Sequence, residues 1–120
     1  KTIIGQVIRG SGTGKKLGFP TINIAFKGQE LPFGVYAAKV YTGGEIYDGA
    51  LHYGPRKLFG FMKPILEVHL IGFDCDLYGK KVKIEIIKKI RGTMDFTNVS
   101  ALKKQIKNDI KKITLHKTHA

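Results

Sequence analysis

Acidic residues, cysteines and long apolar runs are scarce in this sequence of 120 residues. Cys75 is the only cysteine, which excludes an internal disulfide framework, and nothing in the chain requires an oxidising compartment. No apolar run approaches the ~20 residues that a membrane-spanning helix needs, and the N-terminus lacks the basic and apolar succession of a signal peptide. We therefore expect a cytoplasmic protein without a membrane partner.

The shortage of acidic residues leaves a strongly basic chain. Nine Asp and Glu stand against 21 Lys and Arg, which gives a net charge of +12. Such an excess favours anionic partners, but its sign alone does not separate nucleotides from nucleic acids or acidic membranes. Many of the cations lie between Lys103 and Lys117, on the expected outer face of a helix, where solvation is a sufficient reason for them.

Internal repeats, low-complexity tracts and linkers are absent as well. The length suits one domain with one core, so the sequence predicts a single domain over residues 1–120. Because the chain begins at Lys1 within a segment that has the pattern of a strand, we expect this domain to come from a longer protein.

The first two thirds of the chain have the pattern of short strands. Apolar residues come in brief runs rich in Val, Ile, Tyr and Phe, separated by Gly, Pro and Asp. Thr42-Gly43-Gly44 predicts a hairpin turn. Connections this short leave no room for crossover helices, so neighbouring strands should be antiparallel. The pattern predicts a mainly β fold, a six-stranded antiparallel barrel between about residues 2 and 89, with strands near 3–9, 21–26, 34–41, 45–52, 64–72 and 81–89.

One helix is expected after the strands, over about 98–114. Thr97 or Asn98 can cap its N-terminus. An apolar stripe at helical spacing should pack on the barrel, while the lysines face away and residues 115–120 fray. The stripe consists of Val99, Leu102, Ile106, Ile110 and Ile113.

A stretch rich in glycine and lysine follows the first strand. Gly10, Gly12 and Gly14 offer a flexible backbone with amide donors, and Lys15 and Lys16 add cations, a combination that suits a polyphosphate. The spacing is one residue too short for a Walker loop and for the dinucleotide fingerprint. A surface loop with glycine turns explains the stretch equally well.

The segment after this loop is unfavourable for a helix because it contains Gly18 and Pro20. The fixed φ of Pro20 instead leads the chain into a stiff strand, in which Thr21 and Asn23 point to the same face. A hydroxyl and a carboxamide oxygen are hard ligands that suit Mg²⁺ when phosphate oxygens complete the shell. The alternative is a pair of polar residues on a solvent face.

Glu67 is the one carboxylate inside a strongly apolar strand, and we predict that it is a general base. The alternation of the strand puts Glu67 and His69 on one face and Leu66, Val68 and Leu70 on the other. Apolar surroundings would disfavour the charged form of the carboxylate, which is one way to tune a base. The alternative is an exposed carboxylate on the polar side of a sheet.

With these residues in their order, the chain resembles the riboflavin kinase family, in the form of the C-terminal domain of bacterial bifunctional riboflavin kinase/FAD synthetase. The resemblance covers nearly the whole chain, and so many motifs in one order are far more specific than any one of them. The motifs are Leu17-Gly18-Phe19-Pro20-Thr21-Ile22-Asn23, Gly34-Val35-Tyr36-Ala37, Glu67-Val68-His69-Leu70 with Phe73, Asp76-Leu77-Tyr78-Gly79-Lys80, Ile90-Arg91 with Phe96, and Leu102 to Asp109.

The resemblance implies a Greek-key barrel and the Mg²⁺-dependent transfer of the γ-phosphate of ATP to the ribityl 5′-hydroxyl of riboflavin, giving FMN. It implies that Thr21 and Asn23 contact Mg²⁺ and the nucleotide phosphates and that Glu67 is the base. Arg91, in the loop before the helix, would belong to a flap over the site. The expected partners are these small molecules, and the family also allows an N-terminal FMN adenylyltransferase domain in a parent chain.

Flavin needs a flat apolar slot, for which the expected walls are Met94 and Phe96 in the segment 91–99 and the helix face at Leu102 and Ile106. Core packing alone would also explain these residues. One departure from the family stands at Lys57-Leu58, where the family continues Pro-Thr, and this leaves the role of that loop open.

Two other functions compete with a kinase. A small basic barrel can bind nucleic acid, although the aromatic residues of this chain do not cluster among its cations as such readers require, and nucleic acid is therefore not expected as a partner. A member of the family could also bind flavin without turnover.

Overall fold

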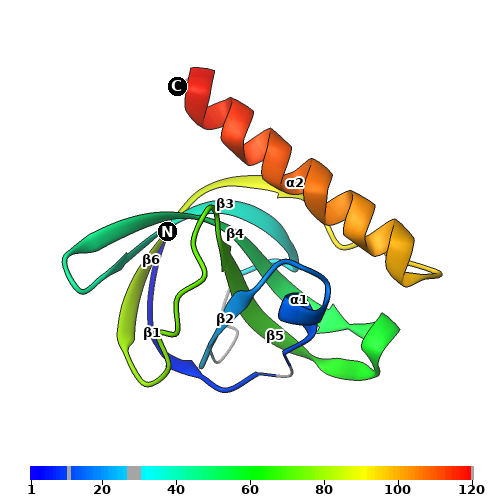
Figure 1. Ribbon diagram of the computed structural model, residues 1–120, viewed down its shortest axis with the longest axis horizontal. Coiled ribbons are helices and arrows are strands. Elements are labelled where there is room, and N and C mark those ends of the chain that lie inside the picture. Colours follow the sequence, from blue (N-terminus) through cyan, green and yellow to red (C-terminus); the bar gives the residue numbers. More distant parts are fainter. Residues whose placement is uncertain (11, 27–30, 120) are drawn as a thin grey trace.

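The computed structural model of the protein describes residues 1–10, 12–26 and 31–119 (Figure 1). Its main body is a barrel of six strands, with a short helix at the rim and a long helix laid across the outside. The strands are β1 (Thr2–Ile8), β2 (Thr21–Ile24), β3 (Gly34–Thr42), β4 (Glu45–Arg56), β5 (Phe61–Leu70) and β6 (Lys81–Arg91), and the helices are α1 (Thr13–Lys16), the 3₁₀ turn η1 (Lys57–Phe59) and α2 (Val99–His119).

The strands close in the order β1-β2-β5-β4-β3-β6, and every neighbouring pair is antiparallel. This confirms the predicted mainly β fold with a closed six-stranded barrel and a C-terminal helix. The predicted hairpin is also present, since Thr42 pairs with Glu45 across a turn in which Gly43 and Gly44 have φ values of 57° and 79°. Two successive positive φ values match the twist of a tight hairpin, and glycine adopts them without strain.

The core fills the barrel with side chains from alternate positions of each strand. Leu66, Val68 and Leu70 of β5 are buried there, as the alternation predicts, together with Leu51 of β4 and Ile84 of β6. The intervening residues of the same strands point outward. The outer surface of β2, β4 and β5 is therefore where polar residues can gather without disturbing the core.

Several element boundaries differ from the prediction. β4 runs on to Arg56 and β5 begins already at Phe61, since Arg56 pairs with Phe61 around η1. Gly60 makes this sharp return possible with φ 81°, a conformation that most residues avoid. The glycine and lysine loop contains the one-turn helix α1, which was not predicted, although the chain beyond Pro20 is a strand as expected.

Helix α2 begins as the sequence suggested and ends later. The side chain of Asn98 caps it, because its Oδ1 accepts a hydrogen bond of 2.9 Å from the Ala101 amide. Leu102 and Ile113 are buried against the barrel, whereas Val99, expected on the same stripe, is 42% exposed. The helix continues to His119, beyond the predicted end near residue 114, and the fraying expected over residues 115–120 stays a prediction. Within the described residues no helix is long and apolar enough to cross a membrane.

Candidate functional site

A row of cross-strand neighbours runs around the outside of the barrel and supplies most of the candidate site. Asn23 on β2 stands opposite Glu67 on β5, and Glu67 stands opposite His52 on β4. His52 in turn pairs with Val35, and Val35 with Arg91 at the end of β6. Directly opposed residues of antiparallel strands share a face, so the register alone brings together side chains that lie far apart in the sequence.

Glu67 is buried on this outer face, with 6% of the residue exposed, so the alternative of an exposed carboxylate is wrong. Its surroundings also differ from the expected apolar ones. Arg56 donates two hydrogen bonds to Oε1, that from Nε measuring 2.8 Å. The guanidinium group fixes the position of Oε1, and within the described part of the chain no residue is hydrogen-bonded to Oε2. One oxygen is therefore held in place and the other is available.

His52 stands next to Glu67 without touching it. The distance from His52 Nδ1 to Glu67 Oε1 is 3.8 Å, too long for a hydrogen bond, and Nδ1 is enclosed without any partner among the described residues. Burial, together with the nearby cations Arg56 and Arg91, lowers the pKa of His52 to about 3. The ring is therefore neutral at pH 7.

Thr21 and His69 form the next cross-strand pair on the same outer face. His69 donates a hydrogen bond of 2.8 Å from Nδ1 to the carbonyl oxygen of Pro20, and Phe19 packs edge-on against its ring. These contacts fasten the start of β2 to β5 and fix the backbone from which Thr21 projects.

The glycine loop lies directly over Thr21 and Asn23. A Cβ atom at Gly10 would sit 2.0 Å from Asn23 Nδ2, and one at Gly14 would sit 3.1 Å from Thr21 Oγ1. Only glycine allows this close approach, which brings the loop backbone to both side chains. Gly12 and Gly18 serve a different purpose, since their φ values of 75° and 88° let the chain turn on either side of α1.

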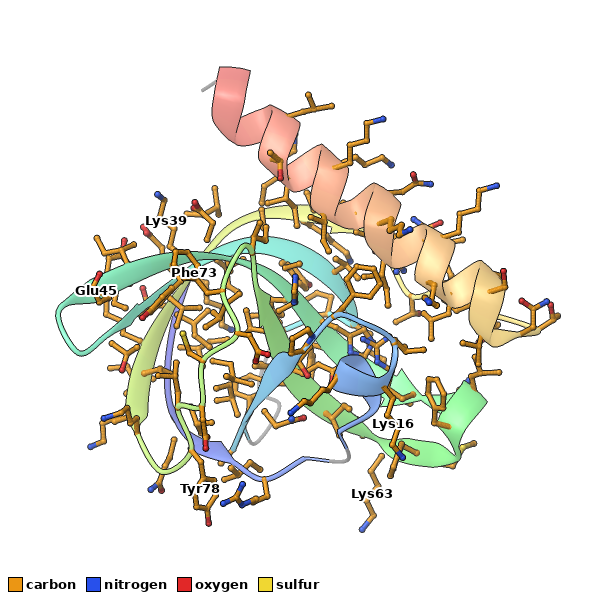
Figure 2. The ribbon with its side chains drawn as sticks, in the orientation of Figure 1. Lys16, Lys39, Glu45, Lys63, Phe73 and Tyr78 are labelled. Carbon is orange, nitrogen blue, oxygen red and sulfur yellow. The ribbon has the colours of Figure 1, made fainter. Side chains whose placement is uncertain are left out.

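The lysines of α1 remain at the surface. Lys15 and Lys16 are exposed, and Figure 2 shows Lys16 on the side of the molecule opposite the hairpin that carries Glu45. Among the described residues, no ion pair ties either lysine to an acidic residue. The backbone amide of Lys16 donates a hydrogen bond of 3.1 Å to the carbonyl oxygen of Gly12, which closes the single turn of α1.

Three hollows adjoin these residues. The central pocket is bordered by Gly14, Thr21, Glu67 and His69, and by Ile106 and Asp109 of α2. The large pocket, of about 520 Å³, lies between the segment 92–96, η1 and α2, with Phe33, Met94, Phe96 and Leu102 among its walls. The third, of about 410 Å³, lies at Gly10 and Asn23 on the other side of β2.

Arg91 does not lie in a loop, as the resemblance implied, but is the last residue of β6. Its guanidinium group forms a two-pronged ion pair with Asp109 of α2, with Nη2 to Oδ2 at 2.9 Å and Nε to Oδ1 at 3.0 Å. Gln105 adds a hydrogen bond of 3.0 Å to the same carboxylate. Asp109 is 3% exposed, so this cluster anchors the long helix to the barrel beside the site.

The structure thus brings most of the predicted residues together and adds others. Glu67, Thr21 and Gly14 meet at the central pocket, and Met94, Phe96 and Leu102 meet at the large one. The residues missed by sequence reasoning as parts of the site are His52, Arg56 and Asp109. Asp109 could have been found from the sequence, because it is a polar residue on the apolar stripe of a helix. His52 and Arg56 could not, because their place beside Glu67 depends on the register of the strands.

Thr21 and Asn23 fit the expected role of metal ligands. Both are partly buried polar residues on one face of β2, and the glycines of the loop let its backbone come close to both side chains. The described residues contain no group of three or more His, Cys, Asp or Glu that could hold a metal ion. A Mg²⁺ ion at this place would therefore take most of its oxygen ligands from phosphate groups and water, as is usual for nucleotide-bound Mg²⁺.

Comparisons with known proteins agree with this arrangement. The family model for flavokinase, described as riboflavin kinase, matches residues 1–116. A bifunctional riboflavin kinase/FMN adenylyltransferase of Haemophilus influenzae is 41% identical over 110 residues, which cover 90% of this chain and 36% of that protein. An RNA-binding riboflavin kinase of Bacillus subtilis is 37% identical over 109 residues, covering 90% of this chain and 47% of that protein.

Among solved structures, one titled as a macrolide-efflux protein of Streptococcus pneumoniae superposes with a TM-score of 0.79 at 28% identity. The match covers 92% of this chain and 37% of that one. The chain therefore spans less than half the length of each of these proteins, and it corresponds to one part of them.

Proposed function

The chain belongs to the riboflavin kinase family, and we propose that it transfers the γ-phosphate of ATP to the 5′-hydroxyl group of riboflavin, giving FMN, with Mg²⁺ bound to the nucleotide. We place this reaction in the cytoplasm. The observation that carries the proposal is the position of Glu67, a buried carboxylate with one free oxygen, between a large pocket with apolar walls and the loop over Thr21 and Asn23.

In this proposal Glu67 is the general base. Arg56 holds Oε1 and leaves Oε2 to accept the proton of the attacking hydroxyl group. Phosphoryl transfer needs little covalent help from a protein, because positioning and charge stabilisation provide most of the acceleration. A single oriented carboxylate is then a sufficient base.

The phosphate groups of ATP would lie under the glycine loop. Backbone amides of the loop suit phosphate oxygens, and Lys15 and Lys16 are free to turn toward them. Thr21 and Asn23 would hold Mg²⁺, whose charge offsets that of the phosphates during transfer.

The flavin ring would occupy the large pocket. Phe33, Met94, Phe96 and Leu102 give it apolar walls, and the half-exposed side chain of Met94 offers apolar surface to a flat ring. The altered segment Lys57-Leu58 forms part of η1 and lines the same pocket. We infer that this segment contributes to the wall that faces the flavin.

We further propose that the parent chain carries an FMN adenylyltransferase domain before this one, as the name of the Haemophilus influenzae relative states for that protein. This domain by itself would stop at FMN.

The test is to incubate the domain with riboflavin, ATP and Mg²⁺ and to separate FMN from riboflavin by chromatography. The variant Glu67→Gln should lose about a hundredfold or more in kcat, because it removes a general base. Glu45→Gln is the matched control, since Glu45 is exposed at the β3–β4 hairpin, on the opposite side of the molecule from Lys16 of the glycine loop (Figure 2).

The outcomes separate the competing functions. Equal FMN formation by the wild type and Glu67→Gln would overturn the role of Glu67. Riboflavin binding without FMN formation would indicate a flavin-binding protein without turnover. A salt-dependent shift of a labelled oligonucleotide, with neither FMN nor flavin binding, would favour the basic nucleic-acid barrel.

A further inference from the structure

Three side chains stand at the passage between the large pocket and the central pocket. His52, Arg56 and Arg91 are the residues that border both hollows. A molecule that fills the large pocket and presents a hydroxyl group to Glu67 has to pass them. Arg56 is already bonded to Glu67 and Arg91 to Asp109. Of the three, His52 is the one with a buried side-chain atom, Nδ1, that has no hydrogen-bond partner among the described residues.

The position of His52 fixes which of its nitrogens carries the proton. Nδ1 faces Oε1 of Glu67 at 3.8 Å, and a lone pair directed at a carboxylate would be repelled, so the proton belongs on Nδ1. Nε2 of the neutral ring is then an acceptor. Because Nδ1 is enclosed while the residue borders both pockets, the ring edge that carries Nε2 is the one a ligand can reach.

We propose that His52 is a substrate-binding residue whose Nε2 accepts a hydrogen bond from a hydroxyl group in the polyol chain of the substrate, next to the hydroxyl group that Glu67 deprotonates. This inference rests on the proposed function. Nε2 of the neutral ring needs a hydrogen-bond donor. A hydroxyl group can donate its proton to Nε2, whereas a phosphate dianion has no proton to donate. His52 therefore selects for a polyol chain at the passage and leaves the phosphates to the glycine loop.

A buried acceptor of this kind discriminates strongly, because an analogue without the matching hydroxyl group leaves it unpaired. The neighbouring charges strengthen the effect. Arg56 and Glu67 hold the far side of the site rigid, so the ring cannot turn to another partner without losing its place opposite the carboxylate.

The first test compares His52→Leu with His52→Gln. Leucine removes the acceptor and also an unpartnered buried polar group, so the variant should fold at least as stably as the wild type. Its dissociation constant for riboflavin, measured by flavin fluorescence without ATP, should rise about three- to tenfold. The KM for ATP should not change. His52→Gln places an amide oxygen near the position of Nε2 and should recover most of the affinity.

The second test uses riboflavin analogues that each lack one hydroxyl group of the polyol chain. One analogue should bind equally well to the wild type and to His52→Leu, while riboflavin and the other analogues still distinguish the two proteins. In the wild type, the ¹⁵N resonance of His52 Nε2 should shift when riboflavin binds, and this measurement needs no variant.

Two results would overturn the inference. Riboflavin could bind His52→Leu as tightly as the wild type, or all analogues could lose the same factor, which would indicate packing and not a hydrogen bond. Failure of the proposed function looks different, because the wild type would then form no FMN at all.

Discussion

At the scale of single residues, the candidate site depends on what surrounds Glu67. The sequence indicates a carboxylate in apolar company, yet the structure gives it a guanidinium partner in Arg56 and a neutral imidazole in His52. Arg56 keeps the carboxylate of Glu67 in place, and burial keeps the imidazole of His52 neutral. These two neighbours are what turn a polar residue of a strand into an oriented carboxylate.

The buried neutral His52 leads to a prediction about stability and pH. Burial, with help from Arg56 and Arg91, lowers its pKa to about 3 in the folded protein, against an ordinary value of 6.5. Between these values the unfolded chain binds a proton that the folded protein does not. The free energy of unfolding should therefore fall as the pH decreases below 6.5, by up to about 1.4 kcal/mol per pH unit from this residue.

Urea unfolding of the wild type and of His52→Leu at pH 7 and at pH 4.5 measures this contribution. Glu67, Arg56 and Arg91 face His52 and are present in both proteins, so the difference between the two pH dependences belongs to His52 alone in the first approximation. Identical pH dependences would contradict a pKa lowered by burial.

At the scale of elements, the barrel was predictable and the details of the site were not. Alternating apolar positions and the glycine turn at Gly43-Gly44 are local signals, and they fixed the strands and the antiparallel pairing. The opposition of Asn23 and Glu67 pairs β2 with β5, which are not adjacent in the sequence, and the opposition of His52 and Glu67 depends on where the turn at η1 sets the register of β4 and β5. Local sequence patterns do not determine the register of paired strands, so the sequence did not predict Arg56 and His52 as neighbours of Glu67.

Helix α2 was also only partly predictable from the sequence. Its cap and most of its apolar stripe follow from local spacing, but the buried Asp109 on the stripe makes sense only with Arg91 on the barrel beside it. This ion pair is where we expect the docking of the helix to be most sensitive. Removal of one partner leaves a buried, uncompensated charge.

We therefore predict that Asp109→Ala lowers the free energy of unfolding by about 3 kcal/mol, measured by urea denaturation. The double variant Arg91→Met, Asp109→Leu should regain most of this loss, because an apolar pair of similar size needs no desolvated charge. Lys107→Ala on the exposed side of α2 is the control and should change stability by less than about 0.5 kcal/mol. A loss in Asp109→Ala no larger than in this control would show that the ion pair does not anchor the helix.

At the scale of the whole molecule, the hollows are arranged along one side of the barrel. The large pocket and the central pocket meet at His52, and the third hollow begins where Asn23 ends the row of opposed residues. Helix α2 borders the large pocket and the central pocket, and part of the excess positive charge is carried by its exposed lysines. Two ligands could thus approach from different hollows and meet at Glu67, as transfer between two substrates requires.

This arrangement predicts that the two ligands stabilise the protein independently, and that only one of them needs Mg²⁺. Riboflavin should raise the melting temperature with or without EDTA, because its pocket contains no predicted metal ligand. ADP should raise it only when Mg²⁺ is present. At a hundredfold excess over the dissociation constant, each ligand contributes about 2.7 kcal/mol, which corresponds to a shift of roughly 10 °C for a domain of this size.

The variant Asn23→Leu separates the two effects. It removes a predicted Mg²⁺ ligand under the glycine loop, so the shift caused by Mg²⁺ and ADP should be lost while the shift caused by riboflavin persists. Asn108→Leu on α2 is the matched control, since Asn108 is exposed and outside all three hollows. If Asn23→Leu retained the full ADP shift, the metal would have to be held elsewhere, and if EDTA abolished the riboflavin shift as well, the two pockets would not act independently.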